Sequence, residues 1–316
     1  MEFNDAAMSL VQKQSVFRLF KFIYLIIISL IFVDCSSSVI TEKQKQETPQ
    51  ENDNPTTYDL KLHFDQLYKK IGNRDSLKVA YLDLMQLSGE DTLVPWQNQK
   101  MAELSFYLAT YTQVSPDSSK MLYNRGREAA SSLLSGTPQI LSYLQDGQED
   151  GSGEIPQISD SQALDAVYWW ATNTLFWYSN ETPVARIVAR KKLERAIKLI
   201  KQNNPDYRFA AVDRLRGLLL TFSPDGDLME AQNAFEASIQ SAENFVENRY
   251  MYARYYAVML QNQQLFNSQM NKILAFDGKN PQGFNQLNAL VQARAADYLD
   301  EETGFFIGKM PVRINE

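Results

Sequence analysis

The segment DLMEAQNAFEASIQSA, residues 227–242, decides the fold class of this chain. Its first residue, Asp227, is of a type that caps helix N-termini, and the apolar or small residues after it recur three or four positions apart. These positions are Leu228, Ala231, Phe235, Ser238 and Ala242. Because such positions share one face of an α-helix, the segment predicts a helix that buries that face.

The same spacing recurs from Leu60 onward, and the alternation typical of β-strands is almost absent. Two further sets are Met101, Leu104, Leu108 and Tyr111, and Phe266, Met270, Ile273 and Leu274. Turn-forming residues separate the segments at 88–89, 115–117, 135–138, 203–205 and 223–226. The pattern predicts about ten helices in an all-α fold of stacked antiparallel helical hairpins. With 13 Gly and 11 Pro, the chain has too few turn residues for an all-β fold.

Three of the expected hairpins carry a weak tetratricopeptide-like (TPR-like) pattern, in which small residues flank a large apolar one. The sets are Ala189, Leu193 and Ala196; Ala231, Phe235 and Ser238, with Gly217 on the preceding helix; and, more loosely, Ser119, Tyr123 and Gly126. Small residues let paired helices approach, and the large residue fills the groove between them. We therefore expect the hairpins to be TPR-like.

The composition excludes several classes of function. The chain has 316 residues, and 31 Lys and Arg against 38 Asp and Glu give a net charge of −7, which argues against a nucleic acid partner. One Cys and one His cannot build a zinc site of these ligands. Catalysis by a Ser-His or Cys-His pair would rest on His63, which has no partner near it in the sequence. We predict no catalytic residues, no metal site and no cofactor.

The N-terminal region resembles a bacterial lipoprotein signal. Residues 22–33, FIYLIIISLIFV, form an uncharged run shorter than the roughly 20 residues of a membrane-spanning helix, which is typical of a signal-peptide core. Cys35, the only cysteine, follows almost at once, although Asp34 stands where a small residue is expected. We predict a lipoprotein-type signal peptide over residues 1–34 and lipidation of Cys35. An uncleaved anchor and a secreted chain are the alternatives.

Residues 35–57 are mostly polar and predict a flexible tether, because they cannot bury enough apolar surface to offset the entropy lost on ordering. The helical domain is expected over residues 58–316. Within it, residues 139–158 are interpreted as an acidic surface loop that interrupts the helices. Its DGQEDG motif, residues 146–151, resembles the start of a calcium loop, but Gln148 and Gln157 stand where acids are needed.

The segment ALDAVYWWATNTLFWY, residues 163–178, predicts a helix with aromatic residues on all sides. Such a helix either packs in the core or lines a cavity for a small apolar or amphipathic ligand. Asp165 and Asn173 share a face with Trp169, and polar groups among buried rings need partners, which favours the cavity.

Two arginines interrupt apolar helix faces near the C-terminus, Arg254 and Arg294. A buried guanidinium must be paired or face a wet cavity, so each forms an ion pair, for example with Asp165 or a nearby Glu, or binds an anionic head group. The candidate ligand-binding residues are Asp165, Trp169, Trp170, Asn173, Trp177, Tyr252, Arg254, Tyr255, Asn288 and Arg294.

An ordered set of motifs resembles the T component family of TRAP (tripartite ATP-independent periplasmic) transporters. These motifs are LYNRGR at 122–127, the aromatic segment at 163–178, YARYYAV at 252–258 and LNALVQARA at 287–295. The likeness covers roughly residues 76–306, and Asp34 and the acidic insertion near Asp146 depart from it. The resemblance implies a periplasmic lipoprotein of TPR-like hairpins that binds a solute-binding protein, with a homotrimer worth testing.

We therefore expect a non-enzymatic accessory subunit of a solute uptake system. It would be held by its lipid on the periplasmic side of a bacterial membrane, the outer rather than the inner one. One alternative is a TPR-like scaffold of the cell envelope, which predicts a groove without a closed aromatic cavity. The other is a helical glycosidase, which predicts two carboxylates about 5 to 10 Å apart in a cleft.

Overall fold

The structure, a computed structural model, describes residues 57–87, 94–146, 154–278, 284–300 and 304–307. Within these ranges the chain forms twelve α-helices and one π-helical segment, and no strand occurs in them. The predicted all-α fold is confirmed, with a helix count close to that expected. The predicted signal peptide, Cys35 and all but the last residue of the predicted tether lie outside the described residues.

The helices follow one another mostly through short connections. The first six are α2 (Thr57–Tyr68), α3 (Arg74–Gln86), α4 (Val94–Tyr111), α5 (Pro116–Leu134), α6 (Pro138–Asp146) and α7 (Ser161–Ser179). They are followed by α8 (Pro183–Asn203), α9 (Ala211–Phe222), α10 (Leu228–Ser241), α11 (Glu247–Met251), the π-helix η1 (Tyr252–Ala257), α12 (Gln263–Leu274) and α13 (Asn285–Asp300).

The helix boundaries follow the capping chemistry of the sequence. The Asp227 carboxylate accepts hydrogen bonds from the backbone N–H groups of Met229 and Glu230, at 2.8 and 3.0 Å, and caps α10 as predicted. Ser115 caps α5, whose first residue is Pro116. The predicted turns between residues 115 and 226 all coincide with helix ends.

Glycines bring paired helices close together at positions of the weak repeat pattern. Phe235 is fully buried between α9 and α10, and a Cβ built on Gly217 would lie 2.9 Å from its ring. On α5, a Cβ built on Gly126 would overlap the amide of Asn173 on α7. Both approaches are too close for any side chain at the glycine position.

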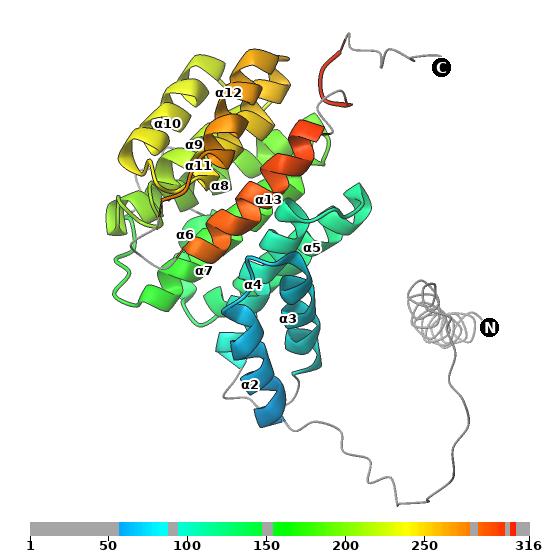
Figure 1. Cartoon of the computed structure of the whole chain (residues 1–316). Helices are drawn as coiled ribbons and strands as arrows, with labels where there is room; N and C mark the ends of the chain where they lie inside the picture. Colours follow the sequence, from blue (N-terminus) through cyan, green and yellow to red (C-terminus); the bar gives the residue numbers. More distant parts are fainter. Residues whose placement is uncertain (1–56, 88–93, 147–153, 279–283, 301–303, 308–316) are drawn as a thin grey trace, which may run out of the picture. The chain divides into compact units, whose positions relative to one another are not determined.

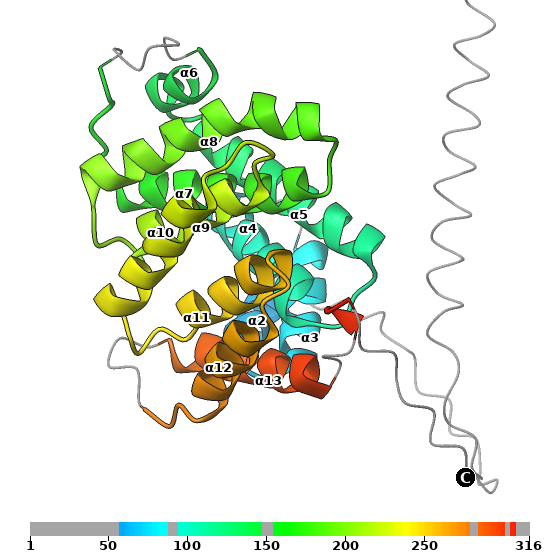
Figure 2. The same ribbon diagram turned by 90° about the horizontal axis from the view of Figure 1, so that it is seen from above.

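Neighbouring helices pack along the chain, and the last helix returns to the first pair (Figure 1). Contacts join α4 to α5, α5 to α7, α7 to α8 and α9 to α10, while α13 packs on α4, α11 and α12. The N–H of Gly72, in the turn between α2 and α3, donates to Gln286 Oε1 on α13 at 2.9 Å. Seen from above, α6 and α8 lie on the opposite side from α12 and α13 (Figure 2).

One part of the sequence interpretation is wrong. Residues 138–146, assigned mainly to an acidic loop, form α6, because Ile140, Tyr143 and Leu144 bury one helix face. Arg195 of α8 donates to the carbonyl of Leu144 at 2.8 Å and holds α6 in place. Residues 147–153, with most of the calcium-like motif, lie outside the described residues.

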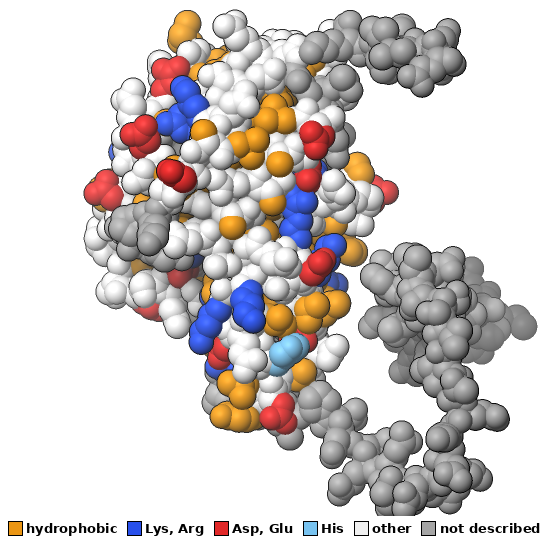
Figure 3. All heavy atoms as spheres, in the orientation of Figure 1, with side chains coloured by type: hydrophobic (Ala, Val, Ile, Leu, Met, Phe, Trp, Pro, Cys, Tyr) orange, Lys and Arg blue, Asp and Glu red, His pale blue; other side chains and the backbone are white. Residues whose placement is uncertain are grey.

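The surface carries apolar side chains and charges of both signs, interspersed over the face seen in Figure 3. His63 lies on this face, and its Nδ1 is 2.7 Å from Asp83 Oδ2 on α3, a partner too distant in sequence to be predicted. None of the helices in the described ranges has the length and apolar character needed to cross a membrane.

Candidate functional site

Two pockets lie toward opposite ends of the same three helices, α4, α7 and α13. The first, the Asp165 pocket, has a volume of about 550 Å³ and is lined by Gln99, Glu103 and Tyr107 of α4, Asp165 of α7 and Leu287 of α13, with Arg208. The second, the Arg254 pocket, has a volume of about 380 Å³ and is lined by Thr110 of α4, Phe176 and Ser179 of α7, and Arg294 and Tyr298 of α13, with Arg254. Since an α-helix rises 1.5 Å per residue, the stretch from Asp165 to Phe176 separates the pockets by roughly 17 Å.

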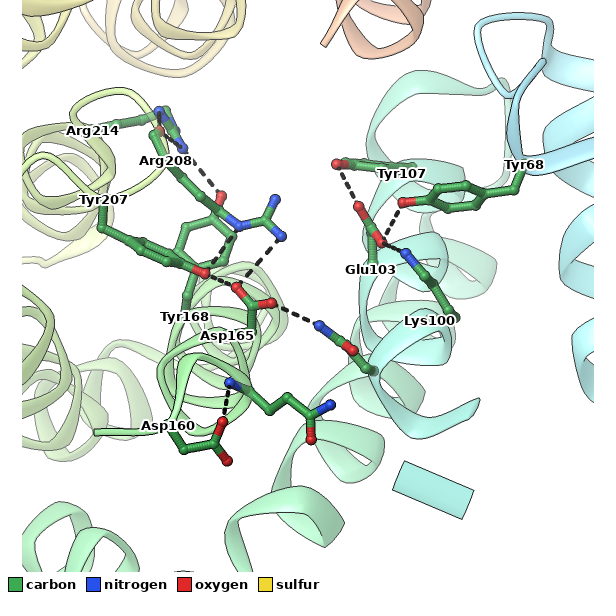
Figure 4. Close-up of polar contacts among 12 residues, drawn as sticks. Tyr68, Lys100, Glu103, Tyr107, Asp160, Asp165, Tyr168, Tyr207, Arg208 and Arg214 are labelled. Carbon is green, nitrogen blue, oxygen red and sulfur yellow. Dashed lines mark hydrogen bonds and ion pairs between the residues drawn. The ribbon is translucent and has the colours of Figure 1, made fainter. Parts of the chain in front are cut away.

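Glu103 anchors the polar network on the α4 wall of the Asp165 pocket (Figure 4). Its carboxylate accepts hydrogen bonds from Tyr68 Oη at 2.8 Å, Lys100 Nζ at 3.1 Å and Tyr107 Oη at 3.1 Å. Burial alone would raise the pKa of Glu103, but Lys100 and Arg208 hold that pKa below its usual value. Glu103 is therefore an anion at neutral pH and lacks the raised pKa of a glycosidase general acid.

Asp165 lies on the α7 wall of the same pocket (Figure 4). It accepts a hydrogen bond from Gln99 Nε2 at 2.7 Å and one from Tyr207 Oη, and Arg208 Nη2 lies 3.7 Å from its Oδ1. The sequence analysis suggested Asp165 as an ion-pair partner of Arg254 or Arg294. That suggestion is wrong, because the partner is Arg208.

Arg208 reaches the pocket from a strained turn between α8 and α9. Arg208, Phe209 and Ala210 have φ angles of 42°, 56° and 61°, a left-handed conformation that costs roughly 1–2 kcal/mol for each residue with a side chain. The buried Arg214 donates to the carbonyl of Phe209 at 3.3 Å, and the Arg208 guanidinium lies over the Trp169 ring at 4.8 Å. These contacts hold a positive charge near both carboxylates of the pocket.

A buried ion pair supports this turn from behind. Arg214 of α9 and Glu247 of α11 are each 2% exposed and lie 3.5 Å apart. Arg214 also donates to Asn248 Oδ1 at 2.7 Å and to Tyr168 Oη at 3.1 Å, and Tyr111 Oη donates to Glu247. Because every charge has several partners, the pair can remain buried.

Four tyrosines lie in series between the pockets, and we call Tyr107, Tyr111, Tyr250 and Tyr298 the tyrosine ladder. Successive ring centroids are 6.0, 5.3 and 6.2 Å apart. Tyr107 lines the Asp165 pocket, Tyr298 lines the Arg254 pocket, and all four side chains are buried. Tyr250 Oη donates to the carbonyl of Thr110 at 3.1 Å, which fixes a central ring of the series. A continuous set of packed rings therefore separates the two pockets.

Arg254 and Tyr255 reach the second pocket from η1. The Arg254 guanidinium lies 4.6 Å from the ring centroid of Phe305 and 5.1 Å from that of Tyr298. Arg294 Nη1 donates to Asp297 Oδ2 at 3.0 Å, so its ion-pair partner is a residue one helical turn away.

The family model described as TRAP transporter T-component matches residues 102–306, more than half of the chain. The chain belongs to this family. The resemblance found in the sequence is thereby confirmed, and the coarse function follows: the protein is a T component, an accessory subunit of a TRAP transporter. Comparison with curated proteins gives no significant match.

The matched region of this T component includes the described walls of the Arg254 pocket and much of the Asp165 pocket. Of the ten candidate residues, Asp165 lines the first pocket, and Arg254, Tyr255 and Arg294 line the second. The aromatic helix α7 and Arg294 thus border one pocket, but α7 contributes Phe176 and its C-terminal end instead of Trp169.

The other candidates lie between or beside the pockets. Trp169 is 1% exposed and packs on Phe106 and Tyr107, so its ring belongs to the core. Four of the remaining candidates have definite partners. Asn173 donates to the carbonyls of Ala102 and Trp169, and Asn288 donates to the carbonyl of Asn244. Tyr252 stacks on Phe235, and the guanidinium of Arg127 lies over the ring of Trp177. Trp170 is partly buried against the core.

The sequence analysis missed the charged residues that organise the Asp165 pocket of the T component. Glu103 and Arg214 are charged residues within apolar helical stretches, as Arg254 is. A search of the whole sequence for charged residues in such stretches would have found both. Arg208 carries no such signal, because it lies in a turn and its place depends on Arg214 and Asn248.

Proposed function

We propose that this T component binds the solute-binding protein of its TRAP transporter and holds a small apolar or amphipathic ligand in one of its two pockets. The single observation that carries the proposal is the family match over residues 102–306, since the family implies association with that protein. The two pockets on α4, α7 and α13 support the ligand part, because each combines aromatic walls with a few polar groups, as small-molecule sites commonly do.

The partner is tested with a TRAP-type solute-binding protein from the same organism as this chain. We expect isothermal titration calorimetry to detect a complex between the two purified proteins. The matched control is a solute-binding protein of an unrelated TRAP system, which should bind far more weakly. No complex at the highest soluble concentration, or equal binding of both proteins, would refute the partner and favour a generic TPR-like scaffold.

The location belongs to the same proposal. The apolar run before Cys35 supports a lipid anchor on the periplasmic side of a bacterial membrane, the outer membrane being expected. Mass spectrometry of separated membranes should find an N-terminal, acylated Cys35 peptide in the outer-membrane fraction. An unmodified Cys35 within an intact leader would contradict the anchor.

The oligomeric state is tested separately, because it rests on the family alone. We propose a homotrimer, and light scattering after size-exclusion chromatography should give three times the mass of the mature chain. A monomeric mass over a wide concentration range would contradict it without affecting the partner.

A further inference from the structure

The Arg254 pocket carries an excess of positive charge. Arg74 and Arg294 share one carboxylate, that of Asp297, at 2.7 and 3.0 Å. Within the described ranges, Arg254 has no ion-pair partner, and no acidic side chain lines the pocket. The described residues that line the pocket therefore carry two positive charges, and the one carboxylate that pairs with either of them, that of Asp297, is shared with Arg74.

The arginines also have unused hydrogen-bond donors. The Nε atoms of Arg254 and Arg294 are both buried, and neither has an acceptor among the described residues. A buried donor without an acceptor is unfavourable by roughly 1–3 kcal/mol, and more when it is charged. Two such donors beside one pocket indicate that an acceptor enters it from outside.

The pKa of the neighbouring Tyr298 reflects the same positive charge. Burial alone would raise the pKa of Tyr298, but Arg254 and Arg294 lower it below the usual value for a phenol. The two guanidinium groups therefore outweigh burial at Tyr298, whereas burial raises the pKa of Tyr255, which lines the same pocket.

The C-terminal ends of α7 and α13 oppose an anion at the pocket, because their carbonyl groups carry partial negative charge. Ser179 Oγ and Asn180 Nδ2 both donate to the carbonyl of Phe176, at 2.7 and 2.9 Å. These bonds occupy that carbonyl and weaken its repulsion of an anion.

The backbone of η1 is a second, independent sign of a site. A π-helix is rare and commonly marks a functional position, because it gives up α-helical geometry to present particular side chains. Here Arg254 and the adjacent Tyr255 both line the pocket, while Tyr252 and Tyr256 pack on Phe235 on another side. The wider turn thus delivers two consecutive side chains to one pocket.

We propose that the Arg254 pocket binds the carboxylate group of a small organic acid. The guanidinium groups of Arg254 and Arg294 hold the carboxylate, since the planar fork of Arg matches its two oxygens. Phe176 and Phe305 provide apolar walls for the rest of the molecule, and about 380 Å³ is at the small end of ligand sites. The inference deepens the proposed function by giving the ligand's polar group, and it does not depend on the solute-binding protein.

The test is calorimetric titration of the purified full chain with hexanoate, hexan-1-ol and inorganic phosphate. We expect hexanoate to bind and the neutral alcohol and phosphate to bind much more weakly. The variant Arg254→Gln should weaken hexanoate binding roughly tenfold to hundredfold, the loss of one charged hydrogen bond or two. The matched control is Arg216→Gln, which removes the same charge from an exposed ion pair with Glu230. If Arg254→Gln does not fold, Arg254→Lys is tested in its place. This variant should also bind hexanoate more weakly, because an ammonium group cannot donate two parallel hydrogen bonds to one carboxylate as a guanidinium does.

Several results would overturn the inference. If hexan-1-ol bound as tightly as hexanoate, the charge of the carboxylate would have no role in binding. If phosphate bound as tightly as hexanoate, the site would bind anions in general and would not be specific for an organic acid. If Arg254→Gln bound hexanoate with unchanged affinity, the ligand would bind outside the Arg254 pocket. If hexanoate bound only after Glu301 and Glu302 were both changed to Gln, these two carboxylates, and no external ligand, would be the partners of Arg254 and Arg294. A chain that binds hexanoate but no solute-binding protein refutes only the partner proposed above, and the reverse result refutes only this inference.

Discussion

The carboxylate of Asp297 on α13 lies 2.7 Å from the guanidinium of Arg74 at the start of α3. This ion pair, with the hydrogen bond from Gly72 to Gln286, ties the last helix to the first helical pair. Because α13 borders both pockets, the pair also holds one wall of each pocket in place.

Removing this carboxylate should destabilise the protein measurably. Asp297→Asn takes a charged acceptor from Arg74 and Arg294, and we expect the free energy of unfolding in urea to fall by about 1–2 kcal/mol, since the pair is only partly buried. The control is Asp225→Asn, whose carboxylate pairs with Arg190 at 3.0 Å but is 60% exposed. It should cost at most about 0.5 kcal/mol. Equal losses of unfolding free energy in the two variants would show that the ion pair between α3 and α13 stabilises the fold no more than an exposed ion pair does.

Glu103 should make stability depend on pH. Its pKa is lower when folded than when unfolded, so it stabilises the fold above the unfolded pKa of about 4.3, and this contribution is lost as pH falls through the folded pKa. We expect Glu103→Gln to cost about 3 kcal/mol at neutral pH, because Lys100 and Arg208 lose a buried partner.

The deficit of Glu103→Gln relative to the native chain should shrink as the pH is lowered below about 4. Urea unfolding at a series of pH values measures it, with Glu128→Gln, an exposed residue on α5, as the control. A deficit that stays constant with pH would mean that Glu103 is not a paired anion.

Gly217→Ala should destabilise the chain although alanine is the better helix former. In an open helix the change would add up to about 1 kcal/mol of stability. Here the new methyl group would meet the buried ring of Phe235, and overpacking costs about 1–3 kcal/mol. The double variant Gly217→Ala with Phe235→Leu should lose less than the sum of the single changes, as measured by chemical denaturation. Strictly additive losses would contradict the close contact.

The fold was predictable from the sequence because its signals are local. Asp227 caps α10 through N–H groups two and three residues away, and the apolar period sets which face is buried. The α6 helix was missed because only a short apolar set, Ile140, Tyr143 and Leu144, marks it beside acidic residues.

The site was only partly predictable because its contacts join distant residues. Arg254 was found from its charge in an apolar run, but its distance from Asp165 depends on how the fold places η1 relative to α7. The contact of Tyr111 with Glu247 and the π-helical turn of η1 have no signal in sequence spacing, because tertiary packing decides both.

Trp169 gives the sharpest test of whether the aromatic helix serves the core or a ligand. Its ring is fully buried, packs on Phe106, Tyr107 and Tyr168, and lines neither of the two pockets. We therefore expect Trp169→Ala to cost about 3–5 kcal/mol in chemical denaturation. Its indole N–H has no acceptor in the described ranges, so Trp169→Phe loses no hydrogen bond and should cost only about 1–2 kcal/mol.

The matched control is Trp177→Ala on the same helix. Trp177 is only partly buried and carries the Arg127 guanidinium over its ring at 4.3 Å, so its loss should cost about 1–2 kcal/mol. Titration of each folded variant with hexanoate completes the comparison. If Trp169→Ala kept its stability and lost ligand binding, the ring would line a binding cavity and its assignment to the core would be wrong. A large stability loss with the smaller loss in Trp177→Ala would confirm that Trp169 supports the wall between the two pockets.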